Sequence, residues 1–482
     1  MLFSDLLFLY LFLPVLFIFY FTSNNIIYKN IVLIFFSLLF YSWGEPFFVL
    51  LLIASVAVNY FFGLIIDHFN QKGNRKTVKF FTAAIITADL AMLCAYKYLP
   101  FIAANLNFIP GVSINLPRTA IPLGISFFTF QLISYIVDVR RGTAAVQCSF
   151  YKLLLYIAMF PQLIAGPIIR YGDISVQIDE RRADIAIINE GIFRFSLGLA
   201  KKVLLANQLG AAANQLLGAS FENATVLSAW AGALFFALYI YYDFSGYSDM
   251  AIGLGKMFGF SYKENFDYPY ISRSAGEFWR RWHISLGSFF RDYVYIPLGG
   301  NRRFWLRNVL IVWLLTGLWH GASWNFIAWG LYYAVLLMLE KGVRTSKAAE
   351  KIPYKIAAAF SHIYMIAATL IGWTVFYYTD GFFARVGLMF GAAMSGSSVL
   401  LYDVFEKSVI GDNIILLAVA VILATPIVPF VSGKIRSAME QKPNVLYFVL
   451  RIIKTVFSVT AVAVSTVMLT GSTYTPFLYF KF

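Results

Sequence analysis

Charged residues are scarce in this sequence of 482 residues, at 13%, whereas hydrophobic residues reach 60% and aromatic residues 18%. A soluble fold could not bury so much apolar surface, so a water-soluble protein is excluded and a polytopic membrane protein is predicted. Cysteine is almost absent, and Cys94 and Cys148 offer neither a disulfide framework nor a metal-binding spacing. The net charge of +14 fits cytoplasmic loops and anionic headgroups, so membrane lipids are the expected partners and nucleic acid is not.

Apolar stretches follow one another along the whole chain. Those at 31–41, 150–166 and 308–319 are shorter than the roughly 20 residues that a full span requires, so we expect tilted or re-entrant segments there. The chain lacks an internal repeat or a long polar linker, which favours a single membrane domain over residues 1–482. From these stretches we expect about 11 transmembrane helices.

Lysine and arginine predict the orientation in the membrane. The segments 67–79, 341–355 and 434–454 are rich in both residues and are expected to face the cytoplasm. Counting spans from these segments puts Met1 and the aromatic tail at 471–482 outside the cytoplasm.

One region, residues 241–340, breaks the apolar pattern and is the predicted catalytic core. Between residues 261 and 310 there are eight lysines and arginines and four acids, which favours short amphipathic or re-entrant helices at the cytoplasmic interface. Within EFWRRWHISLGSFFRDYVYI, apolar residues at spacings of three and four predict one face of a helix; they are Phe278, Trp282, Leu286 and Phe289.

Two acids, Asp243 and Asp249, lie at the predicted end of the membrane span before this region. Acids at membrane depth are costly and usually face a cavity or a partner. The alternative to a functional role is that Asp243 caps a helix and Asp249 pairs with a nearby arginine.

The chain has only four histidines, and two of them, His283 and His320, lie in the polar region. His320 stands in LWHGASWNF between highly apolar stretches, where a neutral imidazole could take a proton from a weak nucleophile. Gly321 allows close approach, and Asn325 could orient the ring or bond a carbonyl. The alternative is a buried histidine that is hydrogen-bonded to a neighbour. A metal site and a serine hydrolase are both disfavoured, because HExxH and GxSxG motifs are missing.

Several long stretches resemble the membrane-bound O-acyltransferase (MBOAT) family. They include FPQLIAGPIIRYGDI, YYDFSGYSDMAIGLGKMFGF, RRWHISLGSFFRDYVYIPLGGNR and LTGLWHGASWNFIAWGLYY. The resemblance is closest to the bacterial branch that O-acetylates alginate, peptidoglycan or cellulose. It implies an all-α fold, with a ring of about 11 transmembrane helices plus re-entrant and interfacial helices around a central tunnel.

The same resemblance implies roles for individual residues. His320 matches the base of the family, and His283 matches its second polar site. The donor is expected to be acetyl-CoA, as a substrate and not a tightly bound cofactor, and no metal is expected. The residues expected to bind the donor are Trp279, Arg280, Arg281, Arg291, Tyr295 and Asn325. Arginine suits a donor that carries phosphates, although contact with lipid headgroups would also explain these arginines.

The aromatic tail GSTYTPFLYFKF suggests a further role. Short aromatic tails of related acylation systems imply that Tyr479 carries the acyl group, since a phenolate leaves more easily than an alkoxide. Aromatic residues anchored at the membrane interface are the alternative.

The resemblance also implies a bacterial cytoplasmic membrane protein that works with an extracytoplasmic SGNH-type acetyltransferase partner on an exported polysaccharide. The sequence does not identify the polysaccharide. A non-covalent transporter and a scaffold of a polysaccharide export complex are the alternatives from other functional classes. A transporter is disfavoured because the sequence shows no inverted repeat.

Overall fold

The computed structural model describes residues 1–116, 120–344, 354–392, 400–438, 443–471 and 476–478, and the regular elements in these ranges are all helices. The chain packs as two compact units, Met1–Phe195 with Tyr247–Glu264, and Ser196–Gly246 with Asn265–Phe482. Two of the three boundaries fall within α10 (Ile185–Ala200) and α12 (Val226–Met257), so both helices continue from one unit into the other, and the third follows Glu264. The fold is all-α, as predicted, whereas the single domain and the ring around a tunnel stay predictions.

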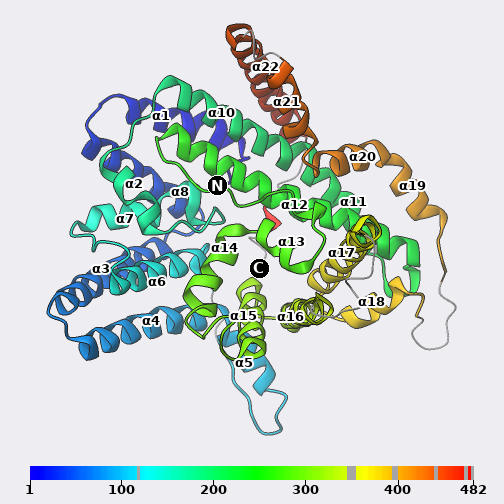
Figure 1. Ribbon diagram of the computed structural model, residues 1–482, viewed down its shortest axis with the longest axis horizontal. Helices are drawn as coiled ribbons and strands as arrows, with labels where there is room; N and C mark the ends of the chain where they lie inside the picture. Colours follow the sequence, from blue (N-terminus) through cyan, green and yellow to red (C-terminus); the bar gives the residue numbers. More distant parts are fainter. Residues whose placement is uncertain (117–119, 345–353, 393–399, 439–442, 472–475, 479–482) are drawn as a thin grey trace. The chain divides into compact units, whose positions relative to one another are not determined.

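The first unit holds the amino-terminal helices, drawn in blue to cyan in Figure 1. Helices α3 (Phe48–Gln71) and α4 (Arg75–Lys97) pack as a hairpin, and the Asn74 side chain caps α4 by accepting a hydrogen bond from the Thr77 N–H at 3.2 Å. The other elements are η1 (Phe8–Phe12), α1 (Leu13–Phe21), α2 (Ile26–Ser42), α5 (Leu99–Leu106), α6 (Ile125–Arg141), α7 (Phe150–Ala158), α8 (Phe160–Leu163) and α9 (Tyr171–Asp179).

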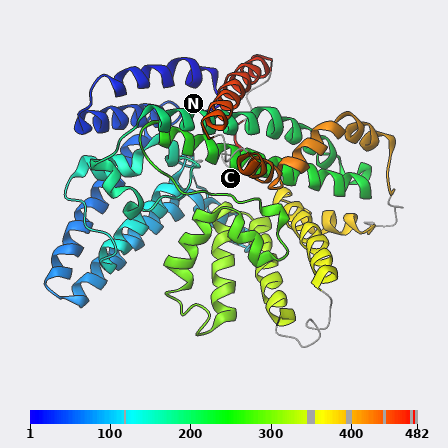
Figure 2. The same cartoon turned by 45° about the horizontal axis from the view of Figure 1, so that its top comes forward.

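The second unit carries most of the predicted core, whereas Tyr247–Glu264 belong to the first unit. Helices α15 (Trp305–His320), α16 (Trp324–Arg344) and α17 (Tyr354–Tyr377) run side by side, in yellow-green to yellow in Figure 2. The other elements are η2 (Lys201–Ala206), α11 (Asn207–Leu217), η3 (Phe221–Asn223), η4 (Pro269–Ile271), α13 (Ala275–Arg281), α14 (Ile284–Phe290), η5 (Arg291–Tyr295), α18 (Phe382–Met389), α19 (Val404–Asp412), α20 (Ile414–Leu423), α21 (Ile427–Ala438) and α22 (Pro443–Thr470).

The protein is a multi-pass membrane protein. Within the described ranges, six helices are long and apolar enough to cross a membrane, or seven if the bent pair α20 and α21 forms one span; the six are α3, α4, α12, α16, α17 and α22. The prediction of about 11 spans is therefore not confirmed. Several apolar stretches form short helices instead, as at 150–166, where Met159 separates α7 from α8.

Two glycines allow α15 and α16 to cross closely. A Cβ atom added at Gly317 would lie 2.3 Å from the Phe326 carbonyl oxygen, and one at Gly330 would lie 2.3 Å from the Trp313 carbonyl oxygen. Any larger residue would push the two helices apart. This crossing fixes the end of α15, where His320 is the last residue.

Two local predictions are wrong. The helix expected across Phe278, Trp282, Leu286 and Phe289 is broken into α13 and α14, because His283 has a φ of 45°. All four apolar residues are nevertheless buried. The span expected to end at the two acids also continues, since α12 runs on to Met257.

Candidate active site

A cavity of about 490 Å³ lies in the second unit, within the size range of ligand sites. Aromatic side chains form much of its wall, from Trp279, Trp282, Trp305 and Trp313. Helices α13 and α14, the segment that follows them and α15 all contribute lining residues. The cavity is thus built by the polar region that the sequence singled out, and it is mainly apolar with a few polar groups.

His283 lines this cavity in a strained conformation. Its φ of 45° and ψ of 56° are left-handed, a region that costs a residue other than glycine free energy and that often marks functional sites. Asn265 stabilises the helix break at His283. Its main-chain carbonyl oxygen accepts a hydrogen bond from the Ile284 N–H at 2.9 Å, and its side-chain oxygen accepts one from the Ser285 N–H at 3.1 Å. The surrounding chain therefore holds the imidazole in place.

The environment keeps His283 neutral. The residue lies outside the candidate membrane spans and is only 2% exposed. Burial lowers the pKa of its imidazole to about 3, because a buried cation loses its hydration. Its ring lies 4.6 Å from the ring of Phe244 and 5.4 Å from that of Trp319, centroid to centroid. A neutral imidazole can donate or accept a hydrogen bond at a bound substrate.

His320 ends α15 inside a cage of aromatic rings. Its ring centroid lies 4.8 Å from that of Trp319, 5.0 Å from that of Trp329 and 5.1 Å from that of Phe376. His320 is 4% exposed and is not among the residues that line the cavity. It continues the stripe of lining residues on α15, one turn beyond Thr316. Because Trp319 contacts both imidazoles, the two histidines belong to one aromatic cluster.

The predicted donor-binding residues divide into two groups. Four of them line the cavity: Trp279, Arg280, Arg291 and Tyr295. Both arginines are exposed at this cavity, and Arg291 also pairs with Asp292 at 2.7 Å. The hydroxyl of Tyr295 donates to the Asn301 side chain at 2.8 Å.

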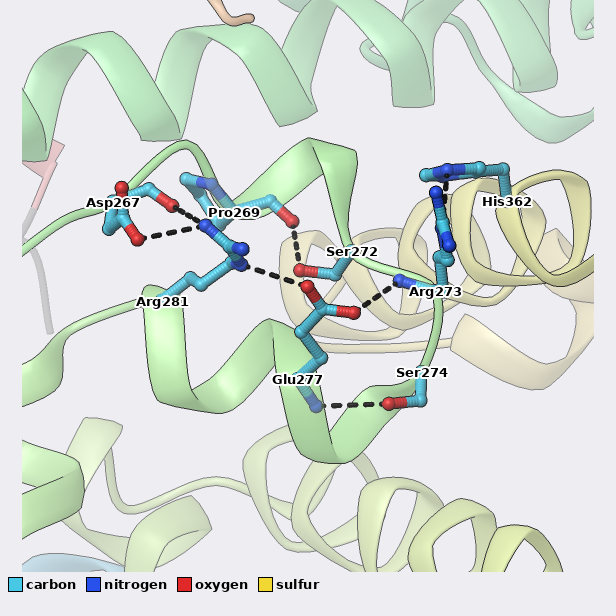
Figure 3. Close-up of polar contacts among 8 residues, drawn as sticks. All are labelled: Asp267, Pro269, Ser272, Arg273, Ser274, Glu277, Arg281 and His362. Carbon is cyan, nitrogen blue, oxygen red and sulfur yellow. Dashed lines mark hydrogen bonds and ion pairs between the residues drawn. The ribbon is translucent and has the colours of Figure 1, made fainter. Parts of the chain in front are cut away.

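Arg281 is not among the lining residues. Its guanidinium pairs with the carboxylates of Asp267 at 2.8 Å and Glu277 at 3.1 Å, as Figure 3 shows. In the same view Arg273 donates to the His362 ring nitrogen at 3.1 Å. These contacts brace the loop before α13, so Arg281 holds the wall together from outside the cavity.

Asn325 is also used within the fold. Its side-chain NH₂ donates to the Phe376 carbonyl oxygen at 2.9 Å, and the side chain is fully buried. Asn325 therefore bonds a main-chain carbonyl and fixes α17 beside the His320 ring. It is not among the cavity-lining residues.

The two acids of α12 have basic partners. Asp249 pairs with Arg194 at 2.6 Å, which is the structural alternative considered from the sequence. Asp243 does not cap a helix but pairs with Lys202 at 2.6 Å, both side chains being 1% exposed. Tyr479 lies outside the described residues.

Sequence reasoning missed three residues of the second unit: Asn265, Phe244 and Lys202. Each acts through a contact with a residue distant in sequence, and no local spacing marks them. Among the described residues no cluster of three His, Cys, Asp or Glu side chains could hold a metal ion. The site thus offers imidazole, indole and guanidinium groups around a cavity.

These features define a helical membrane protein with a buried two-histidine site beside a basic cavity. The family model of MBOAT, the membrane-bound O-acyltransferase family, matches residues 141–379. That range contains both histidines and the cavity. The chain belongs to this family, and it is an O-acyltransferase.

Curated relatives support the same assignment. The chain is 40% identical over 387 residues to the probable alginate O-acetylase AlgI of Pseudomonas aeruginosa, covering 78% of this chain and 72% of that protein. It is 34% identical over 512 residues to the protein of the same name in Pseudomonas putida, covering 100% of both. It is also 34% identical over 413 residues to the peptidoglycan O-acetyltransferase of Helicobacter pylori, covering 78% of this chain and 77% of that protein. These relatives favour the enzyme over the transporter and scaffold alternatives.

Proposed function

We propose that this protein transfers an acetyl group from acetyl-CoA, on the cytoplasmic side of a bacterial cytoplasmic membrane, for the O-acetylation of an exported polysaccharide. The cavity beside the two histidines carries the proposal, because it combines exposed arginines with apolar walls. Arg280 and Arg291 would bind the phosphates of the donor, and the tryptophan walls would hold its thioester arm. The acceptor class follows from the relatives named as alginate and peptidoglycan O-acetylating proteins.

In the proposed reaction His320 is the base. It takes the proton of an acceptor hydroxyl as the hydroxyl oxygen attacks the thioester carbonyl carbon. The new C–O bond forms, the C–S bond breaks, and the thiolate that leaves receives the proton from His320. His283, neutral and held by Asn265, would donate a hydrogen bond to the carbonyl oxygen as negative charge develops there.

Tyr479 is proposed as the first acceptor. Its phenolic oxygen would receive the acetyl group as a tyrosyl ester, which an extracytoplasmic SGNH-type partner would then pass to the polysaccharide. The proximity of the preceding residues supports this step: Leu478 donates its main-chain N–H to Asp243, and the next residue of α12, Phe244, contacts the His283 ring.

The test is acetyl transfer from radiolabelled acetyl-CoA to the purified full-length protein in nanodiscs. We expect label on the wild type, loss of label in His320→Ala and Tyr479→Phe, and wild-type labelling in the control His68→Ala, whose exposed histidine lies in the first unit. If label is lost only in His320→Ala, His320 is still supported as the base, and a residue other than Tyr479 accepts the acetyl group. Full labelling of His320→Ala, or a wild type that neither takes up label nor releases thiol, would overturn the proposal.

A further inference from the structure

The second unit contains a buried ion pair that neither stability nor helix capping explains. Lys202 in η2 and Asp243 in α12 lie 2.6 Å apart, and each side chain is 1% exposed. Removing two charges from water is costly, and well-packed apolar residues often serve stability as well. Ionisable groups buried in a membrane protein are usually retained for a function. The pair is not needed to cap α12, since Asp243 lies inside that helix.

The ion pair binds the last described segment of the chain. Asp243 uses its second carboxylate oxygen to accept the Leu478 main-chain N–H at 2.7 Å. Lys202 donates to the Pro476 carbonyl oxygen at 3.4 Å, and its Nζ lies 4.5 Å from the Phe477 ring centroid. The segment is the short red piece beside α12 in Figure 1.

Two of the three residues of this segment are buried, whereas Pro476 is half-buried. Phe477 is 1% exposed and Leu478 is 7% exposed. The Lys202 ammonium contacts the Pro476 carbonyl oxygen and the Phe477 ring, and the Asp243 carboxylate accepts the Leu478 N–H. Each charge therefore binds the segment in addition to its partner in the ion pair. Recognition through the main chain fixes where the chain runs, and the buried Leu478 side chain adds apolar contact.

We propose that Lys202 and Asp243 form a receptor for the main chain of Pro476–Leu478, which positions the residue that follows for acyl transfer. The catalytic part of this inference rests on the proposed function, whereas binding of the segment does not. The receptor is linked to the site through α12, because Phe244 directly follows Asp243 and its ring lies 4.6 Å from that of His283. Lys202 and Asp243 are thus positioning residues.

The receptor can be removed from either side. Lys202→Met/Asp243→Leu replaces both charges by apolar groups of similar size, which avoids leaving one buried charge without its partner. Leu478→Pro removes the N–H that Asp243 accepts, together with the leucine side chain. Leu478→Ala shortens the same side chain but keeps the N–H, so it is the matched control. The control Lys256→Met/Glu190→Leu removes an ion pair of 3.2 Å whose side chains are 35% and 58% exposed.

Hydrogen–deuterium exchange of the C-terminal peptide of the full-length protein in nanodiscs measures the binding. A hydrogen bond to a charged group slows exchange, so we expect the double receptor variant to exchange about 10- to 100-fold faster there than the wild type and the control pair. Transfer of label from acetyl-CoA is measured on the same samples. It should fall about tenfold or more in the receptor variant and in Leu478→Pro, and less in Leu478→Ala, which keeps the N–H and loses only apolar contact.

The outcomes separate the two claims. Unchanged exchange in the receptor variant would overturn the receptor, whatever the enzyme does. Faster exchange with undiminished labelling would overturn the positioning role. If the wild type takes up no label, the proposed function fails, and the exchange rates still decide whether the receptor exists. Should the double variant not fold, Leu478→Pro against Leu478→Ala provides the same comparison with the ion pair intact.

Discussion

The crossing of α15 and α16 gives a sharp prediction for Gly330→Ala. The added Cβ would lie 2.3 Å from the Trp313 carbonyl oxygen, whereas ordinary contacts begin at 3.4 Å. The clash is with main chain, so no side chain can rotate away, and the helices must separate by about 1 Å. Overpacking of this kind costs about 1–3 kcal/mol, partly offset by about 1 kcal/mol from the better helix propensity of alanine. The net loss of stability should therefore be modest.

Activity should suffer far more than stability. His320 is the last residue of α15, so a shift of the helix moves the imidazole by a similar distance. Misplacing a catalytic group by about 1 Å can cost about 100-fold in rate. We expect Gly330→Ala to fold, to unfold at a slightly lower temperature, and to lose most acyl transfer.

Gly342→Ala is the matched control on the same helix. A Cβ there meets no atom within 4 Å, so the variant should keep wild-type transfer and equal or greater thermal stability. Both properties are measured on purified protein in nanodiscs, by tryptophan fluorescence on heating and by transfer of label. If Gly330→Ala kept transfer within about threefold of the wild type, the claim that this crossing positions His320 would be refuted.

Two further predictions concern residues beside the cavity. The pKa of His283 is near 3 in the folded protein and 6.5 in its ordinary state, so protonation favours unfolding. The free energy of unfolding should fall as the pH drops from about 6.5 toward 3. It should fall less steeply in His283→Asn, because asparagine takes up no proton and tolerates the positive φ. Equal slopes in acid-unfolding curves would contradict this. Of two adjacent arginines, Arg280→Gln should raise the KM for the proposed donor, acetyl-CoA, several-fold, because Arg280 lines the cavity. Arg281→Gln should lower stability by about 1 kcal/mol with the KM unchanged, because Arg281 pairs with Asp267 and Glu277; similar KM values for both variants would contradict the distinction.

Composition and local pattern predicted the class of fold and the region of the site. Low charge and repeated apolar stretches are sufficient for an all-helical membrane protein. The cluster of charge between residues 261 and 310 marked the segment that lines the cavity. Histidine is scarce in the sequence, which drew attention to His283 and His320. In the structure Trp319 contacts both imidazole rings.

The remainder depends on contacts that no local pattern encodes. Apolar spacing runs straight through His283, so periodicity predicted one helix, whereas Asn265 stabilises the break from 18 positions earlier in the chain. Arg280 and Arg281 are neighbours with the same chemistry, and only the position of Glu277 and Asp267 separates their roles. The expected number of spans is not confirmed, because apolar composition does not reveal where a helix is interrupted.

Interruptions of helices are themselves informative in this protein. Where buried main chain leaves a helix, its polar groups need other partners. Both histidines stand at such interruptions: His283 between α13 and α14, and His320 at the end of α15, just before Gly321. Helix α15 ends at His320, so its regular main-chain hydrogen bonding stops where the imidazole enters the aromatic cage. Both breaks coincide with a histidine, and this coincidence is what the proposed chemistry of the two rings requires.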